Sequence, residues 1–344
     1  MSHSVVFKGG NEIYQADSCT PLVDAAARGC VHLQAIGHGH YPGRKLPADA
    51  LPGLKNVGYW DAGHDQDWGL PWHRNEGLEL TFLESGSLGF AADDHDFILE
   101  PDDLTITRPW QLHRVGLPNV TAGRLHWVIL DLGIRRPNHS WKWPEWILLS
   151  DHDRDELTNI LRHNERPVWH ATPDIRRCCK AIACAVESDS GGSSTSTLAV
   201  RLNEICVLLL DMLRSQKAAL DSSLSSSRRT VQLFLNDLRR HPGHLAFDWS
   251  LQVMAEACGL GVTQFISHVK VLVNMTPLHF LKSCRLDMAA RLLRESPELS
   301  ILDVATSCGF CSSQYLATVF AQRFGVSPRD YRKNASIHTF KPAA

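Results

Sequence analysis

The sequence predicts an α+β multidomain protein with a β-rich N-terminal domain, flanking helices and an all-α C-terminal domain. From Tyr59 to Asp131, short alternating apolar runs are interrupted by Gly, Asp or Pro at roughly 8–12-residue intervals, which is typical of a β-sandwich or β-barrel. After Trp146 the apolar residues recur at helical spacing instead. The 344 residues are also about twice the ~150 expected of one domain, so two or three units are predicted.

Changes in composition place the boundaries between these units. Residues 1–55 are rich in Gly, Pro and His and should form loops with short strands, while the Ser-rich residues 221–227 suit a linker. Helical spacing between them predicts helices over 153–163, 173–188 and 197–220. The predicted segments are an arm over 1–55, a β-barrel over 56–150, a helical connecting region over 151–220, a linker over 221–227, a helical domain over 228–335 and a tail over 336–344.

Composition and charge limit the functional classes. With 44% hydrophobic and 21% charged residues, the chain is expected to be globular rather than disordered or fibrous. No apolar stretch approaches the ~20 residues of a membrane helix, so we expect a cytoplasmic protein with reduced cysteines and no membrane partner. From Arg228 onward there are 14 Lys and Arg against 8 Asp and Glu, whereas the preceding part has 21 against 29. The basic C-terminal third predicts a polyanionic partner.

The C-terminal third contains an internal repeat with an offset of 50 residues. Each copy begins with a Ser suited to cap a short helix and ends at a Gly suited to the left-handed conformation that closes it. A second helix follows, with an aromatic residue and a Val expected to face inward, and this arrangement is a helix-turn-helix. The repeated residues are Ser250, Leu251, Ala255, Cys258, Gly259, Leu260, Gln264, Phe265 and Val269, which recur as Ser300, Ile301, Ala305, Cys308, Gly309, Phe310, Gln314, Tyr315 and Val319.

Cys308 and Cys311 also form a C-x-x-C pair. A structural zinc site needs four ligands, and no second pair lies nearby in the sequence. The repeat instead matches Cys308 with Cys258, so we expect both to be small core residues at the turn.

Residues 248–332 resemble the DNA-binding domain of the AraC/XylS family of bacterial transcription regulators. The resemblance lies in the segments 251–260, 275–277, 280–281, 285–286, 289–293, 301–305, 308–310 and 325–332. It implies two helix-turn-helix units joined by a long helix over 277–295, with two recognition helices in successive major-groove segments. The implied partners are double-stranded DNA, a second copy of the chain in a homodimer, and RNA polymerase.

The recognition helices are expected over 262–273 and 312–324, with their outward N-terminal residues at base edges. Gln can read adenine, Ser and Thr either base, and Ile a thymine methyl. The candidate base-reading residues are Thr263, Gln264, Ile266, Ser267, Ser313, Gln314, Ala317 and Thr318. The candidate phosphate contacts, which position without specifying, are Arg239, Arg240, Lys270, Arg285, Arg291, Arg294, Ser312, Arg323 and Arg332.

This chain differs from the family at two positions that should affect its affinity for DNA. Family members often carry Arg where this chain has Ser267 and Thr318, and few cations lie on either helix. Intrinsic affinity for DNA is therefore expected to be modest, which makes dimerisation more important.

The segment from His73 to His113 resembles a cupin. His73, Glu79 and His113 match three of the four ligands found in metal-bearing cupins, but Asn75 replaces the second histidine. Cupins attached to this type of DNA-binding domain generally resemble metal-free sensors of sugars or other small molecules, so we expect no cofactor and no enzymatic activity. The candidate effector-binding residues combine aromatic faces with polar groups, as a carbohydrate requires, and are Trp60, Trp72, His73, Asn75, Glu79, Trp110 and His113.

Three alternatives stay open. The N-terminal half could be a metal-dependent cupin enzyme fused to a DNA-binding domain, with a metal on His73, Glu79 and His113. The protein could instead be a constitutive regulator whose barrel serves only assembly. The helix over 197–220 has a wide apolar stripe, which the family resemblance assigns to dimerisation and which packing on its own barrel would equally explain.

Overall fold

The computed structural model describes residues 6–7, 14–15, 19–93, 95–134, 139–240 and 242–338, so most of the expected tail over 336–344 falls outside it. The chain divides into two compact units, Met1–Ser226 and Ser227–Ala344, and each is treated by itself. Their boundary falls within the expected linker, where Ser222–Ser225 forms a short 3-10 helix, η1. Among the described helices, none has the length and apolar character needed to cross a bilayer.

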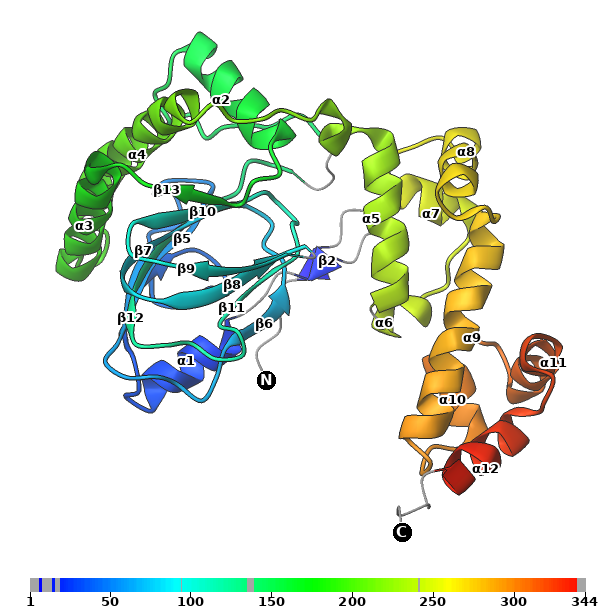
Figure 1. Ribbon diagram of the computed structural model, residues 1–344. Helices are drawn as coiled ribbons and strands as arrows, with labels where there is room; N and C mark the ends of the chain where they lie inside the picture. Colours follow the sequence, from blue (N-terminus) through cyan, green and yellow to red (C-terminus); the bar gives the residue numbers. More distant parts are fainter. Residues whose placement is uncertain are drawn as a thin grey trace. The chain divides into compact units, whose positions relative to one another are not determined.

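Two sheets form the body of the N-terminal unit (Figure 1). The strands of the larger sheet are, in spatial order, β13 (Val168–His170), β10 (Asp103–Thr107), β7 (Leu78–Gly86), β12 (Gly123–Leu130), β5 (Leu54–Ala62), β3 (His32–Gly37) and β4 (Arg44–Lys45). The strands of the smaller sheet are β6 (Leu70–His73), β11 (His113–Val115), β8 (Leu88–Ala92) and β9 (His95–Leu99). All neighbouring strands in both sheets are antiparallel except β3 and β4. Two short strands, β1 (Val6–Phe7) and β2 (Tyr14–Gln15), form a separate pair.

The expected closed barrel is not confirmed. Hydrogen bonding in the larger sheet ends at β13 and β4, and in the smaller sheet at β6 and β9, so within the described residues neither sheet closes. One apolar cluster instead takes residues from both sheets, including Trp60, Leu83 and Trp127 from the larger and Phe90 and Leu99 from the smaller. The unit is therefore built of facing sheets, and alternating apolar residues could not distinguish this from a barrel because both bury one face of each strand.

Helices flank the sheets of this unit. They are α1 (Thr20–Ala27), α2 (Asp151–His163), α3 (Pro173–Ser188) and α4 (Thr195–Ser215). Helix α3 packs directly on the larger sheet, whereas Leu22 and Ala25 of α1 join the apolar cluster between the two sheets. Ser150 and Thr172 cap α2 and α3 by accepting hydrogen bonds from the N–H groups of Asp153 and Ile175. The arm over 1–55, expected to form loops with short strands, also contains the helix α1 and supplies β3, which lies between β5 and β4 in the larger sheet.

The apolar stripe of α4 is buried within its own unit. Leu198, Leu202, Leu209 and Leu213 are at most 1% exposed and belong to the core that α4 shares with α3 and the larger sheet. The observed packing favours the second explanation of this stripe, because these side chains are already covered without a second copy of the chain.

The C-terminal unit is all-helical, as expected. Its helices are α5 (Ser227–Arg240), α6 (Pro242–Leu245), α7 (Leu251–Ala257), α8 (Val262–Val273), α9 (Pro277–Glu295), α10 (Ile301–Ser307), α11 (Ser313–Phe324) and α12 (Pro328–His338). The predicted helices over 262–273 and 277–295 are confirmed at both ends. In Figure 1, α8 lies beside the first part of α9 and α11 beside its second part, both on the side away from α5.

Both copies of the repeat are capped as expected. Ser250 and Ser300 accept hydrogen bonds from the N–H groups of Val253 at 3.2 Å and Asp303 at 3.0 Å. Gly259 and Gly309 follow with φ of 65° and 76°, the left-handed conformation that closes each helix. Cys258 and Cys308 are fully buried at these turns, whereas Cys311 is exposed.

The offset between the two copies of the repeat increases from 50 to 51 residues at the second turn. As a result, the expectation that Tyr315 faces inward is wrong. α8 begins at Val262 but α11 begins at Ser313, an offset of 51 rather than 50, because the second turn contains one more residue. One extra residue rotates every following side chain by about 100° around a helix. The counterpart of the buried Phe265 is therefore Leu316, and Tyr315 is 46% exposed.

Candidate nucleic-acid interface and buried polar cavity

The outward face of α8 holds the first set of candidate base-reading residues. Phe265 and Val269 are fully buried and fix the rotation of the helix. The opposite face consists of residues that are exposed or, for Ile266, partly exposed, namely Thr263, Gln264, Ile266, Ser267 and Lys270. The sequence therefore identified the outward face of the first recognition helix correctly, although its contact with DNA stays a prediction.

On α11 the buried residues are Leu316, Val319 and Phe320. Gln314 and Thr318 are exposed, while Ser313 and Ala317 are partly exposed. Ser312 lies just before the helix and accepts a hydrogen bond from the N–H of Tyr315 at 3.1 Å, so it caps α11. Ser312 was expected to contact a phosphate. In the structure its hydroxyl caps the start of α11.

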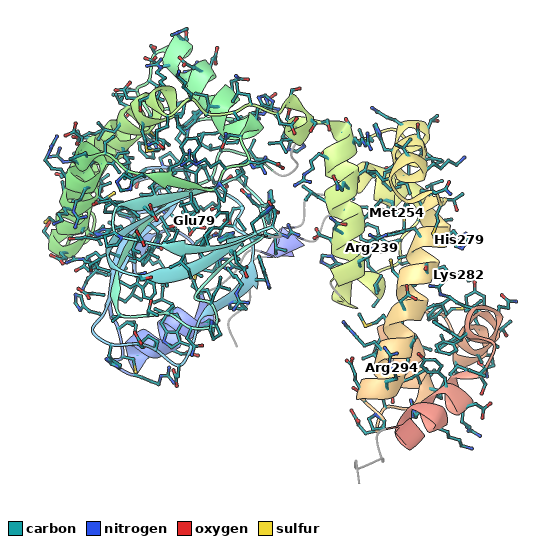
Figure 2. All side chains as sticks on the ribbon, viewed as in Figure 1. Glu79, Arg239, Met254, His279, Lys282 and Arg294 are labelled. Carbon is teal, nitrogen blue, oxygen red and sulfur yellow. The ribbon has the colours of Figure 1, made fainter. Side chains whose placement is uncertain are left out.

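Three candidate contacts were missed in the sequence. Tyr315 occupies the position on α11 that Gln264 occupies on α8 once the offset of 51 is applied. His279 and Lys282 of α9 point to the side on which α8 and α11 lie (Figure 2). The periodicity of α9 could have revealed these two, because Phe280, Leu281 and Cys284 define its buried face.

Among the expected phosphate contacts, Arg285 makes hydrogen bonds inside the domain. Its guanidinium donates from Nε to the carbonyl oxygen of Leu245 and from Nη2 to that of Phe247, both at 2.8 Å. Desolvation by burial lowers the pKa of this group. Because its N–H groups serve two backbone carbonyls within the domain, Arg285 has a structural role, and a phosphate contact by this side chain stays a prediction.

The remaining cations differ in position. Arg239 and Arg294 lie on the α5 side of α9 in Figure 2 and line a hollow of about 400 Å³ with Arg291. Arg323 pairs with Asp287 at 2.9 Å, and Arg332 donates to the carbonyl oxygen of Pro297 at 3.3 Å. The side chain of Arg240 lies outside the described residues, and Lys270 is exposed on α8.

The N-terminal unit encloses a cavity of about 40 Å³. Its walls combine aromatic and polar side chains, among them Tyr41, Asn56, Trp60, Trp68, His73, Asn75, Glu79 and Trp127. Three of the candidate effector residues, Trp72, Trp110 and His113, are not among the lining residues. Trp110 is buried in the core and donates from Nε1 to the carbonyl oxygen of Ile134 at 2.7 Å, whereas Trp72 is 42% exposed.

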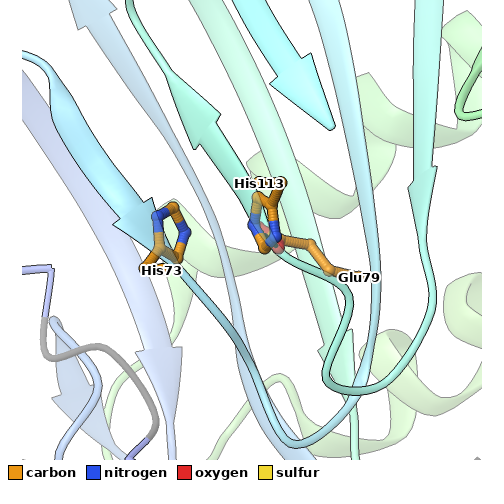
Figure 3. Close-up of side chains that lie close together, drawn as sticks. All are labelled: His73, Glu79 and His113. Atoms are coloured by element: carbon orange, nitrogen blue, oxygen red, sulfur yellow. Dashed lines mark ion pairs between the residues drawn. The ribbon is translucent and has the colours of Figure 1, made fainter. Parts of the chain in front are cut away.

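A buried polar cluster contributes His73, Asn75 and Glu79 to the wall of this cavity, and His113 contacts Glu79. His113 lies with Nε2 at 2.9 Å from Glu79 Oε2, and the ring centroids of His73 and His113 are 4.1 Å apart (Figure 3). Asn75 donates from Nδ2 to Glu79 Oε2 at 2.7 Å. Burial raises the pKa of Glu79, but the two imidazoles and the hydrogen bonds from His113 and Asn75 outweigh burial and leave that pKa lowered. The structure thus brings together four residues that the sequence placed in one site.

Tyr41 is a further cavity residue, which the sequence assigned only to the arm. Its hydroxyl donates to Glu76 Oε2 at 2.5 Å, and Lys55 pairs with Glu76 at 3.3 Å. Desolvation, followed by the charge of Glu76, raises the pKa of Tyr41. The phenol is therefore neutral and acts as a hydrogen-bond donor at the cavity wall.

Comparisons with known proteins agree with the helical geometry. Residues 254–334 match the family model described as a helix-turn-helix domain. The HTH-type transcriptional activator RhaS of Escherichia coli (strain SE11) is 29% identical over 165 residues, covering 48% of this chain and 57% of RhaS. The chain therefore spans little more than half the length of the curated relatives it matches.

The solved structures similar to this chain include those of AdpA and ToxT. The DNA-binding domain of AdpA, a global transcriptional factor crystallised with a target DNA, is 26% identical with a TM-score of 0.30 and covers 34% of this chain and 100% of that one. Unsaturated fatty acid-bound ToxT from Vibrio cholerae strain SCE256 is 12% identical with a TM-score of 0.38, over 83% of this chain and 97% of that one. Both TM-scores lie below 0.5, so neither structure is evidence for the family of this chain. The family assignment depends on the sequence matches to the helix-turn-helix model and to RhaS.

Proposed function

Because the chain belongs to the AraC/XylS family through its C-terminal helix-turn-helix domain, we propose that it is a sequence-specific transcription regulator controlled by a small effector. α8 and α11 would enter successive major-groove segments of double-stranded DNA. The observation that carries this proposal is that the two recognition helices lie on the same side of α9 and that each carries exposed polar residues. The excess of cations after Arg228 supports the same partner.

Within this proposal, base reading belongs to the outward residues of the two helices. On α8 these are Thr263, Gln264, Ile266 and Ser267, and on α11 they are Ser313, Gln314, Ala317 and Thr318, to which the register adds Tyr315. Lys270, His279 and Lys282 would then contact phosphates. Since these are few, we further propose a homodimer that doubles the number of phosphate contacts, and contact with RNA polymerase at promoters in the bacterial cytoplasm.

The effector site that we propose is the cavity beside His73, Asn75 and Glu79. Trp60, Trp68 and Trp127 offer aromatic faces for C–H groups, and the polar residues offer hydrogen bonds, so a sugar or a related polar metabolite suits the walls. Metabolite pockets usually have volumes of roughly 300–1,000 Å³, whereas this cavity has about 40 Å³. Entry of such an effector therefore requires the sheets or the covering arm to open, and an effector that binds only the opened state would shift the conformational equilibrium.

The proposal is tested in two steps. Genome-wide mapping of bound sites with the full chain would supply operators, and fluorescence anisotropy would then measure affinity for one of them. Gln264→Ala and Gln314→Ala should each weaken specific binding by roughly 5–150-fold, as expected for the loss of a base contact worth about 1–3 kcal/mol. Gln232→Ala on α5 is the matched control and should bind as the unaltered chain does. Equal affinity of all four proteins for operator and random DNA would contradict the proposal.

The effector part needs its own measurement. Thermal unfolding of the full chain with a library of sugars and related polar metabolites should identify a ligand that raises the unfolding temperature. Trp60→Ala should abolish that rise, whereas Trp72→Ala, which changes an exposed tryptophan, should not. A library that never shifts the unfolding temperature would contradict effector sensing and leave the DNA-binding part intact.

A further inference from the structure

We propose that the hollow between α5 and α9 binds an acidic segment of a partner protein in an extended conformation. This inference goes beyond DNA binding and effector sensing, because it concerns the α5 side of α9, whereas α8 and α11 lie on the other side. The hollow has a volume of about 400 Å³. Two of its cations, Arg239 and Arg294, are labelled in Figure 2.

One face of α9 forms the length of this hollow. Its lining residues follow the i, i+3, i+4 and i+7 spacing of a single helix side. They are Phe280, Ser283, Cys284, Asp287, Met288, Arg291 and Arg294. At a rise of 1.5 Å per residue, the distance along the helix from Phe280 to Arg294 is about 21 Å. A ligand that contacts both ends must therefore be elongated.

The floor of the hollow is apolar and narrow. Phe280 and Met288 are buried, and Val273 and Met275, which precede α9, add further apolar walls. Spread over about 21 Å, the volume of about 400 Å³ corresponds to a cross-section on the order of 20 Å². A helix with its side chains is about 10–12 Å across, so a single extended chain fits better. At about 3.3 Å per residue, roughly six residues would follow the hollow from end to end.

The arginines at the two ends have N–H groups available to a ligand. Arg239 Cζ lies 4.9 Å from the ring centroid of Phe280, and this stacking restricts the guanidinium without using its N–H groups. Arg294 donates from Nη1 to Tyr331 Oη at 3.3 Å, which uses one of its five N–H groups. Both arginines are exposed, and among the described residues no carboxylate lies within 4 Å of either guanidinium.

The charge of the lining residues is unbalanced. Three arginines accompany one acid, Asp287, which leaves two positive charges in excess. Asp287 Oδ1 accepts a hydrogen bond from Arg323 Nη2 at 2.9 Å, so this acid is already paired with a cation outside the lining. Glu295 Oε2 lies 3.9 Å from Arg291 Nε, beyond hydrogen-bond distance. Such a group of cations attracts an anion, and guanidinium groups bind carboxylates through paired N–H···O bonds.

The walls favour a peptide over a nucleic acid. Single-stranded nucleic acids bind by stacking bases on aromatic faces, but Phe280 is 2% exposed and Arg239 already covers its ring. An acidic peptide with a few aliphatic residues can satisfy the arginines and also cover the apolar floor. The thioether of Met275, which is 37% exposed, can adapt to such side chains.

The experiment uses the full chain and a fluorescein-labelled peptide, Glu-Glu-Leu-Glu-Leu-Glu-Glu, whose extended length is about 23 Å. Fluorescence anisotropy is measured without DNA, so the result does not depend on the proposed regulatory function. We expect one peptide per chain, and binding at least 10-fold weaker when Lys replaces every Glu of the peptide.

Variants of the chain assign the peptide to the hollow. Arg291→Ala and Arg294→Ala should each weaken binding about 5-fold or more, because each removes the partner of a peptide carboxylate. Arg329→Ala, which changes an exposed arginine of α12 outside the hollow, is the matched control and should bind as the unaltered chain does. Circular dichroism checks that each variant is folded. If Arg291→Ala does not fold, Arg294→Ala decides alone, because Arg294 is exposed.

Duplex DNA is then added to the complex of chain and peptide. The peptide should stay bound at saturating DNA, since the hollow and the recognition helices lie on different sides of α9. The proposal is overturned if the acidic peptide shows no saturable binding, or if folded Arg291→Ala and Arg294→Ala bind it as tightly as the unaltered chain. Displacement of the peptide by DNA would also overturn it, as would loss of peptide binding in Lys282→Ala but not in Arg294→Ala.

Discussion

Arg285 on α9 donates from Nε to the carbonyl oxygen of Leu245 at 2.8 Å, which joins the long helix to the end of α6. The same guanidinium also serves Phe247, in the loop between α6 and α7. A side chain that resembles a phosphate ligand in the sequence thus holds the first helix-turn-helix unit against the connecting helix.

Arg285→Ala should therefore destabilise the C-terminal unit rather than change its charge contacts with DNA. Hydrogen bonds from a charged group contribute about 1.5–3 kcal/mol, so a loss on the order of 2 kcal/mol is expected. Amide hydrogen exchange in peptides from α6 to α9 would measure it. The slope of log affinity against log salt should stay unchanged, and a slope reduced by about one unit would instead show that Arg285 contacts a phosphate.

Gly309 lies beside this guanidinium. A Cβ at Gly309 would lie 2.4 Å from the carbonyl oxygen of Leu245 and 2.8 Å from Arg285 Nη2, at a φ of +76°. Gly325 has nearly the same φ, +75°, with nothing within 4 Å. Gly325→Ala should cost about 1–2 kcal/mol for the left-handed backbone alone, and Gly309→Ala should cost more because of the added clash. Thermal unfolding of the two variants side by side checks this order, and equal losses would contradict it.

Much of the fold could be predicted because caps and periodicity are local properties. The bounds of α8 and α9 follow from Gly261, Asn274 and Pro277, which are visible in the sequence. Sheet closure could not be predicted, because it depends on whether edge strands distant in sequence pair. Likewise, Arg285 could be placed on a helix, but its carbonyl partners on another element could not.

In the candidate sites, too, features encoded in local sequence could be predicted and features that depend on tertiary contacts could not. The convergence of His73, Glu79 and His113 could be predicted from a motif. The absence of Trp110 from the cavity wall could not, because its burial against Ile134 depends on tertiary packing. The rotation of α11 was missed for a different reason. A repeat with a fixed offset hides a one-residue insertion when the neighbouring residues, Tyr315 and Leu316, are both large enough to fill a core.

Tyr315 and Leu316 provide a direct test of that rotation. Leu316→Ala should destabilise the C-terminal unit by about 2–5 kcal/mol, because Leu316 is fully buried. Tyr315→Ala should leave stability nearly unchanged and weaken binding to the operator. Thermal unfolding and fluorescence anisotropy of both variants would be compared. A large loss of stability in Tyr315→Ala would restore the inward orientation that the repeat alone suggested.

Lys282 and Arg294 lie on different sides of α9, and their effects on DNA binding should differ accordingly. Lys282→Ala should reduce the salt slope by about one unit, since each neutralised phosphate contributes roughly 0.9. Arg294→Ala should leave the slope unchanged, because Arg294 lines the hollow on the α5 side. A reduced slope for Arg294→Ala alone would place the DNA on the opposite face.

Stability of the N-terminal unit should fall as the pH is lowered from 7, because of His126 and Glu84. His126 Nε2 lies 2.7 Å from Glu84 Oε2, and desolvation outweighs this contact and lowers the pKa of His126. Below the unfolded-state value of about 6.5, the unfolded chain binds a proton that folded His126 does not, so acidification favours unfolding. The pKa of Glu84 is lowered too, because hydrogen bonds and charges from His126 and Lys180 outweigh its desolvation. Its contribution is present above about pH 4.3 and is lost as the pH falls through its folded pKa.

The contributions of His126 and Glu84 to stability can be distinguished, because they are lost in different pH ranges and are removed by different substitutions. His126→Gln should flatten the decline that begins near pH 6.5, and Glu84→Gln should flatten the decline below about pH 4.3. Tryptophan fluorescence during urea unfolding is a suitable measurement, because of the 10 tryptophans only Trp249 follows residue 226. Asp155→Asn, on the exposed side of α2, is the control and should leave both windows as they are. A stability that rises on acidification between pH 7 and 5 would mean that folded His126 is protonated, and that its contact with Glu84 outweighs burial after all.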